Sequence, residues 1–186
     1  MVDVGFGAGE SLELLGEMGF GPLYGYEIDP TLVDRARRRL GPDAQLFATD
    51  ATPMSELDDA SAQVIVVINA LQYLDLTAFA ATVGRVLRPG GHLVGVVPKP
   101  SYYVHPRHLL EVRRGRRPWW LASYPRSALR SAIFSATGRQ PRLGGSAPEI
   151  GWTARTLRRF ADLGGLEIAE ARSTPQNKRA LTLRRA

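Results

Sequence analysis

Short apolar segments alternate with helical patterns along the first hundred residues, and this alternation limits the fold more than any other feature of the sequence. The segment at residues 63–68 is rich in β-branched residues and suits a strand that is buried on both faces. The five predicted strands are residues 2–4, 23–28, 44–48, 63–68 and 92–97. The predicted helices are residues 10–18, 30–40 and 76–87, the last ended by Pro89-Gly90-Gly91. Strands that alternate with helices indicate βαβ units and a parallel sheet.

This pattern is interrupted at residues 98–151, which are rich in proline, arginine and aromatic residues. One or two helices are predicted within this insertion, and the better candidate is residues 126–137. The elements predicted after it are a helix that Thr153 caps and Gly164-Gly165 ends, and strands at residues 166–171 and 180–183. We therefore expect one α/β domain over residues 1–186, with residues 98–151 as a lid or substrate-binding insertion.

Composition excludes several classes of protein. The chain has no cysteine, which excludes disulfides, thiolate zinc sites and cysteine nucleophiles and fits a reducing, cytoplasmic location. No apolar run approaches the roughly 20 residues that cross a bilayer, and residues 1–9 do not resemble a signal peptide. Residues 1–100 carry 7 basic and 13 acidic side chains, whereas residues 101–186 carry 17 and 5. A basic half fits nucleic acid, an anionic membrane surface or an acidic substrate, and equally a solvated arginine-rich surface.

A glycine-rich turn, Asp3-Val4-Gly5-Phe6-Gly7-Ala8-Gly9, joins the first predicted strand to the first helix. Glycines let a nucleotide approach the backbone closely, and the helix amino terminus adds free N–H groups. The spacing Gly-x-Gly-x-Gly differs from the Gly-x-Gly-x-x-Gly of dinucleotide-binding proteins, which makes a dinucleotide-dependent oxidoreductase the weaker alternative. The simpler interpretation is a tight strand-to-helix turn without a ligand.

Polar residues follow the next three strands, at the edge where open α/β sheets bind ligands. Glu27 could accept both hydroxyls of a ribose, with Asp29 as a rival and a plain surface carboxylate as the alternative. Asp50, with Ala51, could accept the exocyclic amine of adenine or could simply open a turn. Asn69 follows the fourth strand. Together with the glycine turn, these residues predict one ligand site.

These motifs resemble those of class I S-adenosylmethionine-dependent methyltransferases of the small-molecule type. The segments that carry the resemblance are residues 2–9, 25–30, 49–51, 69–74 and 87–93. The match extends over residues 1–97 and, less specifically, over residues 152–184. The resemblance implies a three-layer αβα Rossmann-like fold with a seven-stranded, mostly parallel sheet whose last strand is antiparallel.

The resemblance also implies S-adenosylmethionine as the cofactor and gives roles to the residues of the site; no metal site is expected. Gly5, Gly7 and Gly9, in one turn with Phe6, would pass beneath the cofactor, and Asp3 would lie near its methionine end. Glu27 would hold the ribose, Ile28 would pack on the adenine, and Asp50 with Ala51 would bind the adenine edge. Asn69 would lie near the methionine and the transferred methyl group.

The sequence departs from the family in two respects. Family members usually carry helices before the first strand, whereas Met1 lies almost inside that strand here, so a truncated, inactive homologue is one alternative. The Asp/Asn-Pro-Pro-aromatic motif of amine-methylating members is missing, because Asn69 is followed by Ala70-Leu71. This second departure argues against a nucleobase-amine methyltransferase.

The methyl acceptor is the least constrained part of the prediction. Methyl transfer from a sulfonium needs alignment and exclusion of water, and needs a base only if the nucleophile must lose a proton. The candidates for such a base are Tyr73, Tyr102, Tyr103, His105 and His108, and none is singled out; His92 is expected only to begin a strand.

Aromatic and basic residues are interleaved within the insertion. They are Tyr102, Tyr103, Trp119 and Trp120 with Arg107, Arg113, Arg114, Arg116, Arg117, Arg126 and Arg130. This mixture suits an anionic or lipid-like substrate, a peripheral membrane contact or RNA, and equally an amphipathic cover with its arginines in water. From the resemblance, the first hypothesis is a small-molecule methyltransferase. An RNA-directed methyltransferase or RNA-binding module is the alternative.

Overall fold

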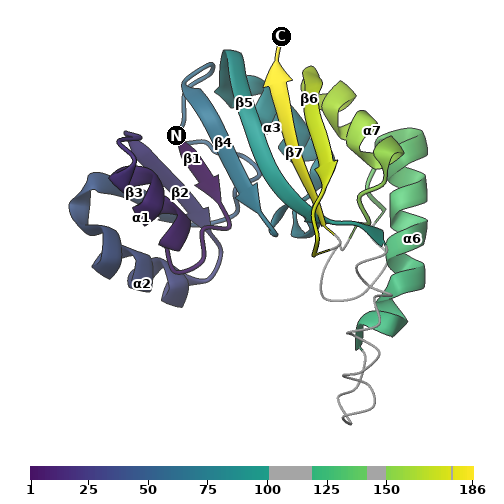
Figure 1. Ribbon diagram of the computed structural model, residues 1–186, viewed down its shortest axis with the longest axis horizontal. Helices are drawn as coiled ribbons and strands as arrows, with labels where there is room; N and C mark the ends of the chain where they lie inside the picture. Colours follow the sequence, from purple (N-terminus) through teal and green to yellow (C-terminus); the bar gives the residue numbers. More distant parts are fainter. Residues whose placement is uncertain (101–118, 142–149, 177) are drawn as a thin grey trace.

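The computed structural model of the 186-residue chain describes residues 1–100, 119–141, 150–176 and 178–186. Seven strands form one sheet in the order β3-β2-β1-β4-β5-β7-β6 (Figure 1). The strands are β1 Val2–Val4, β2 Leu23–Glu27, β3 Ala44–Ala48, β4 Ala62–Ile68, β5 Leu87–Pro98, β6 Leu166–Ser173 and β7 Lys178–Arg185. The α-helices are α1 Glu10–Glu17, α2 Pro30–Leu40, α3 Leu76–Val86, α6 Trp119–Thr137 and α7 Ala154–Gly164, with short 3-10 turns η1 Gly41–Asp43 and η2 Leu71–Tyr73.

The sheet is parallel except at β7, which pairs antiparallel with β5 on one side and with β6 on the other. The parallel strands β1, β2 and β4 are held in register through Val2, which lies opposite Tyr24 and Ile65. This arrangement confirms the predicted three-layer fold and its antiparallel last strand.

Helices lie on both faces of the sheet (Figure 1). The side chains of α1 and α2 pack with Phe6, Leu23 and Leu46 in a small core over β1–β3. The larger core lies on the other face, where α3 and α7 pack against each other and α6 packs outside α7. No described helix covers the face of β4 and β5 that is turned to the viewer in Figure 1, where Ile68 and Val94 are partly exposed.

Two helix boundaries differ from the prediction. Helix α3 ends at Val86, and β5 begins at Leu87 rather than at His92. Because Leu87 pairs with Ala62 and His92 pairs with Val64, residues 88–91 form a bulge within β5 rather than a separate loop. Helix α6 begins at Trp119 and continues through Pro125, although Pro125 provides no backbone N–H.

The other helix termini follow the predicted signals. Asp29 caps α2 and Pro30 begins it, Thr153 caps α7, and Gly165 ends α7 in the left-handed conformation. Strands β6 and β7 extend beyond the predicted segments because they pair with each other from Leu166 to Ser173.

Part of the predicted insertion lies outside the described residues, namely 101–118 and 142–149. The candidates Tyr102, Tyr103, His105 and His108 fall there, and the side chains of Trp119 and Trp120 are likewise not described. Among the described helices, none combines the length and apolar character needed to cross a bilayer.

The crossing of α3 and α7 gives a first prediction. A Cβ atom on Gly84 would lie 2.3 Å from the Gly164 carbonyl oxygen, a backbone atom that cannot rotate away. We expect Gly84→Ala to lower the free energy of unfolding by about 1–3 kcal/mol, measured by urea denaturation. The control is Gly16→Ala in α1, where the added Cβ would meet only the end of the Leu23 side chain. Equal effects of the two substitutions would contradict this account of the crossing.

Candidate functional site

A cleft of about 350 Å³ lies at the carboxyl ends of β1–β4. Its lining residues are Val4, Gly5, Tyr26, Glu27, Ile28, Thr49, Asp50, Ala51, Ile68, Asn69, Ala70, Tyr73 and Leu74. Six of the ten residues predicted for the site therefore lie together in one cleft: Gly5, Glu27, Ile28, Asp50, Ala51 and Asn69.

The glycines of the turn have different physical roles. Gly5 has φ +71°, and a Cβ atom there would lie 2.4 Å from the Cβ of Ala70, so the turn and the segment after β4 touch. Gly9 has φ +89°, and a Cβ atom there would lie 3.0 Å from the Cβ of Ala36 in α2. Gly7 has φ +60°, but a Cβ atom would meet nothing within 4 Å. Packing within the protein thus explains Gly5 and Gly9, whereas space remains free above Gly7.

The Glu27 carboxylate ties the glycine turn to the end of β2. Its Oε2 accepts a hydrogen bond from the Gly7 N–H at 3.1 Å, and its Oε1 accepts from the N–H groups of Ile28 at 2.8 Å and Asp29 at 3.1 Å. A carboxylate has about four lone-pair positions, so about one remains for a further donor. The group is therefore held in place while still able to accept a hydrogen bond from a ligand.

Asp29, the rival of Glu27, has a structural role. Its Oδ1 accepts hydrogen bonds from the backbone N–H of Thr31 at 2.8 Å and from the Thr31 hydroxyl, which caps α2. The hydrogen bond from the Thr31 side chain is the main cause that lowers the pKa of the Asp29 carboxyl. Asp29 does not line the cleft, whereas Glu27 does.

Asp50 and Asn69 face the cleft from strands on either side of it. Asp50 Oδ1 accepts a hydrogen bond from the Thr52 N–H at 2.7 Å, so Asp50 does open a turn, as the alternative interpretation held. Asn69 has φ +56°, an uncommon conformation for a residue other than glycine. The Asn69 N–H donates to the Val96 carbonyl at 2.9 Å, and the Gln72 side chain donates to the Asn69 carbonyl at 2.7 Å. These bonds hold Asn69 at the rim of the cleft.

Exposed apolar side chains also line the cleft. Ile28 is 75% exposed, Tyr73 is 50% exposed and Ile68 is 45% exposed, although large apolar side chains are usually buried. A cleft with apolar walls and a few fixed polar groups is the usual form of a small-molecule site. Sequence reasoning missed Ile68 as a lining residue because it ends a strand that otherwise reads as wholly buried.

The remaining predicted residues, Asp3, Phe6, Gly7 and Gly9, do not line the cleft. Asp3 is 1% exposed and accepts a hydrogen bond from the Ser11 hydroxyl. Phe6 is 4% exposed and packs in the core under α1 and α2, close to Gly25. Burial is the main cause that raises the pKa of the Asp3 carboxyl to about 6; the Ser11 hydrogen bond opposes this effect and the Glu27 charge adds to it.

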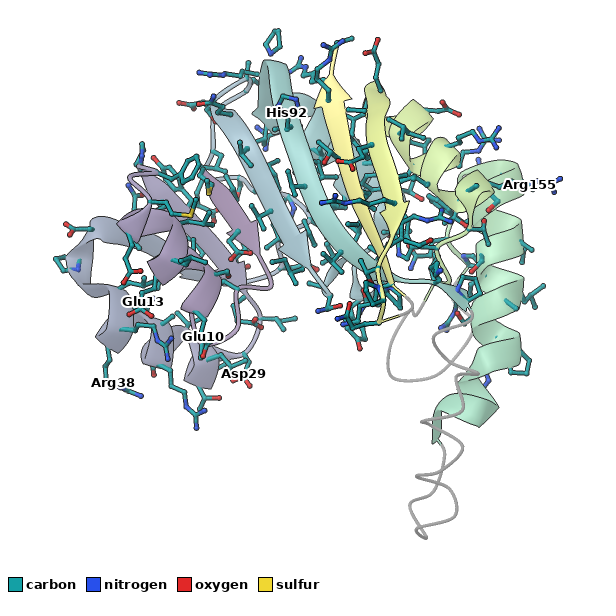
Figure 2. The ribbon with its side chains drawn as sticks, viewed as in Figure 1. Glu10, Glu13, Asp29, Arg38, His92 and Arg155 are labelled. Atoms are coloured by element: carbon teal, nitrogen blue, oxygen red, sulfur yellow. The ribbon has the colours of Figure 1, made fainter. Side chains whose placement is uncertain are left out.

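Figure 2 shows that His92 lies on β5 far from the carboxyl edge, in contrast to Asp29. His92 is therefore remote from the cleft, as expected for a residue within a strand. Tyr73 is the one candidate base that lines the cleft among the described residues. No group of side chains in the described part of the chain could hold a metal ion.

The cleft fits an adenine nucleoside derivative. A fixed carboxylate at the second strand end suits a ribose, and an exposed isoleucine beside it suits the face of a base. Of the three turn glycines, Gly5 lines this cleft.

Comparison with known proteins shows the family of the chain. A family model described as a methyltransferase domain matches residues 2–95, half of the chain. The chain therefore belongs to the methyltransferase-domain family, and it shares the class I fold of solved S-adenosylmethionine-dependent methyltransferases. No curated protein matches the chain.

Solved structures share the fold at low sequence identity. An S-adenosylmethionine-dependent methyltransferase from Mesorhizobium loti has a TM-score of 0.69 at 18% identity, with 99% of this chain and 89% of that chain covered. A Haloferax volcanii methyltransferase in complex with the Trm112 activator has a TM-score of 0.67 at 17% identity, with 98% and 80% covered. A geranyl diphosphate C-methyltransferase from Streptomyces coelicolor, with S-adenosylhomocysteine bound, has a TM-score of 0.64 at 15% identity, with 100% and 71% covered.

The buried Asp3 carboxyl gives a prediction about pH. Because its pKa is raised, the folded chain holds more protons than the unfolded chain between about pH 4 and 6, so Asp3 contributes less stability as pH rises through that window. We expect the free energy of unfolding of Asp3→Asn, relative to that of the wild type, to increase by about 3 kcal/mol as the pH rises from 4 to 7. The raised pKa corresponds to a shift of about two units, and each unit is worth about 1.36 kcal/mol. Urea denaturation at several pH values measures this difference.

Ser11→Ala provides the matched variant for that experiment. It keeps the carboxyl and removes the donor that lowers its pKa, so the transition should move to higher pH. If the difference between Asp3→Asn and the wild type did not change with pH, Asp3 would not be a buried charge.

Proposed function

We propose that the cleft binds S-adenosylmethionine through the residues of the glycine turn and the strand ends, and that the enzyme methylates a small organic acceptor. The observation that carries the proposal is the meeting of Glu27, Ile28, Asp50 and Asn69 in one cleft beside the glycine turn. The cofactor supplies an electrophilic methyl group on a sulfonium, a reaction that needs little besides alignment and exclusion of water.

Glu27 is proposed to hold the ribose. Its carboxylate is oriented by three backbone N–H groups, which lowers the entropy lost when it accepts a hydroxyl. If Glu27 accepts a second ribose hydroxyl, one of its three backbone N–H donors must give up its hydrogen bond. We expect this donor to be the Gly7 N–H, because the other two belong to the residues that directly follow Glu27. Ligand binding and the position of the glycine turn would therefore be coupled.

Ile28, Asp50 and Ala51 are proposed to hold the adenine. Ile28 offers an exposed apolar face, and Asp50 keeps one carboxylate oxygen free of the hydrogen bonds described for it. Gly5, Gly7 and Gly9 provide the backbone floor, while Asp3 and Phe6 support it from below. Asn69 would lie near the methionine end, since it follows the strand next to β1.

The support for a small acceptor comes from the basic half of the chain. Several cations in its described part are engaged within the protein: Arg159 and Arg185 donate to backbone carbonyls, while Arg172 and Arg184 form ion pairs with Glu170 and Glu167. For these arginines, the partners within the protein compete with nucleic-acid phosphates. An RNA-directed methyltransferase is therefore the weaker proposal. We assign no catalytic base.

A calorimetric titration with S-adenosylhomocysteine tests the cofactor site. We expect Glu27→Gln to weaken binding by about tenfold or more, since the amide replaces an acceptor of ribose hydroxyls, a loss of about 1.4 kcal/mol. The control is Glu17→Gln, an exposed acid on α1 outside the cleft, which should bind as the wild type does. Absence of binding by the wild type would favour an inactive homologue.

Ile28→Ala separates binding from folding. Because Ile28 is 75% exposed, its truncation should change the free energy of unfolding by no more than about 0.5 kcal/mol. The same truncation should weaken the binding of S-adenosylhomocysteine several-fold, because the side chain would be covered only in the complex. Leu14→Ala, a similarly exposed apolar residue on α1, is the control that should change neither quantity. Unchanged affinity in Ile28→Ala would remove Ile28 from the adenine site.

A further inference from the structure

One arginine in the described chain differs from the others of similar burial. The half-buried arginines are Arg85, Arg159, Arg179 and Arg185. All except Arg179 donate hydrogen bonds to backbone carbonyl oxygens. The Arg179 guanidinium has no hydrogen bond or ion pair with any described residue. No Arg179 nitrogen is fully buried without a partner, so the five N–H donors of the guanidinium are open to solvent and to a ligand.

Lys99 brings a second cation to the same place. Arg179 lies opposite Val97 of β5 and opposite Ser173 of β6, so these three residues share one face of the sheet. Lys99, two residues beyond Val97, is half-buried, and its Nζ donates to the Ser173 hydroxyl at 3.2 Å. The described residues provide no carboxylate partner for either cation. Two cations close together without a counter-charge make this part of the surface favourable for an anion.

The cation pair lies at the same edge of the sheet as the cofactor cleft. The Asn69 N–H at the rim of the cleft donates to the Val96 carbonyl of β5, and β7 is the next strand. Neighbouring strands are about 4.8 Å apart, which puts β7 about 10 Å from β4. In Figure 1 the end of β5, the start of β7 and the end of β6 converge at this edge. Glu27 and Asp50 lie along the part of this edge that forms the cofactor cleft, whereas Lys99 and Arg179 lie along the part formed by β5 and β7.

We propose that Arg179 and Lys99 bind an oxyanion of the methyl acceptor, a phosphate or carboxylate group, and so select a small anionic substrate. A guanidinium holds either group through two parallel hydrogen bonds, and the ammonium has donors left after the one to Ser173. A groove of about 400 Å³, lined by Pro100 directly after Lys99 and otherwise by residues of α6 and around the start of α7, offers room for part of the acceptor. This inference rests on the proposed function, because it assigns the acceptor side of that site.

The test is an NMR titration of the full ¹⁵N-labelled chain with sodium phosphate or sodium acetate, at constant ionic strength adjusted with sodium chloride. We expect saturable shifts of the amide signals of Val97, Lys99, Ser173, Thr174, Lys178 and Arg179. Arg179→Gln should weaken the phosphate interaction by about tenfold or more. Arg179→Lys keeps the charge but loses the planar fork, so it should give an intermediate affinity. Much tighter binding of phosphate than of acetate indicates a phosphorylated acceptor, and similar binding indicates a carboxylated one.

Arg172→Gln is the matched control, because Arg172 precedes Ser173 in the same strand but is exposed and paired with Glu170. Its phosphate affinity should equal that of the wild type. Equal losses in Arg172→Gln and Arg179→Gln, or no saturable shift in the wild type, would overturn the inference. S-adenosylhomocysteine is titrated into the same samples. If it binds normally while phosphate does not, the inference fails and the cofactor site stands. If phosphate binds at Arg179 and S-adenosylhomocysteine does not, the anion site stands and the proposed function fails.

Discussion

The parallel pairing of β1 with both β2 and β4 is the constraint on which the site depends. β1 has only three residues, yet it fixes the ends of its neighbours on both sides. The backbone of Gly5, one residue beyond β1, touches Ala70 on one side and donates to the Tyr26 carbonyl at 2.8 Å on the other. The polar residues that follow the strands are therefore brought together mainly by hydrogen bonds of the sheet, to which the hydrogen bond from Gly7 to Glu27 adds.

This dependence explains why much of the fold and site could be predicted from the sequence. Apolar periodicity locates the strands, and residues at their carboxyl ends must then meet at one edge. Glu27, Asp50 and Asn69 were found in this way, and they do line one cleft. The helix ends could also be predicted, because they depend on neighbouring residues only. Asp29 and Pro30 begin α2, while Thr153 begins α7 and Gly165 ends it.

What the sequence could not provide depends on contacts between distant segments. The bulge in β5 exists because Leu87 pairs with Ala62, which proline and glycine at positions 89–91 do not reveal. The core position of Phe6 depends on its packing against Gly25. Arg179 was indistinguishable from other arginines of the basic half until the register of β7 put it beside Lys99 and Ser173.

The strand order also has a consequence for synthesis. β6 pairs with no described strand except β7, and β7 is inserted between β5 and β6. Because domains are made from the amino terminus, β6 leaves the ribosome with no strand to pair with until residues 178–185 follow it. A premature stop codon just before Lys178 would therefore remove an interior strand of the sheet rather than an edge, and β6 would be left without its ladder of hydrogen bonds.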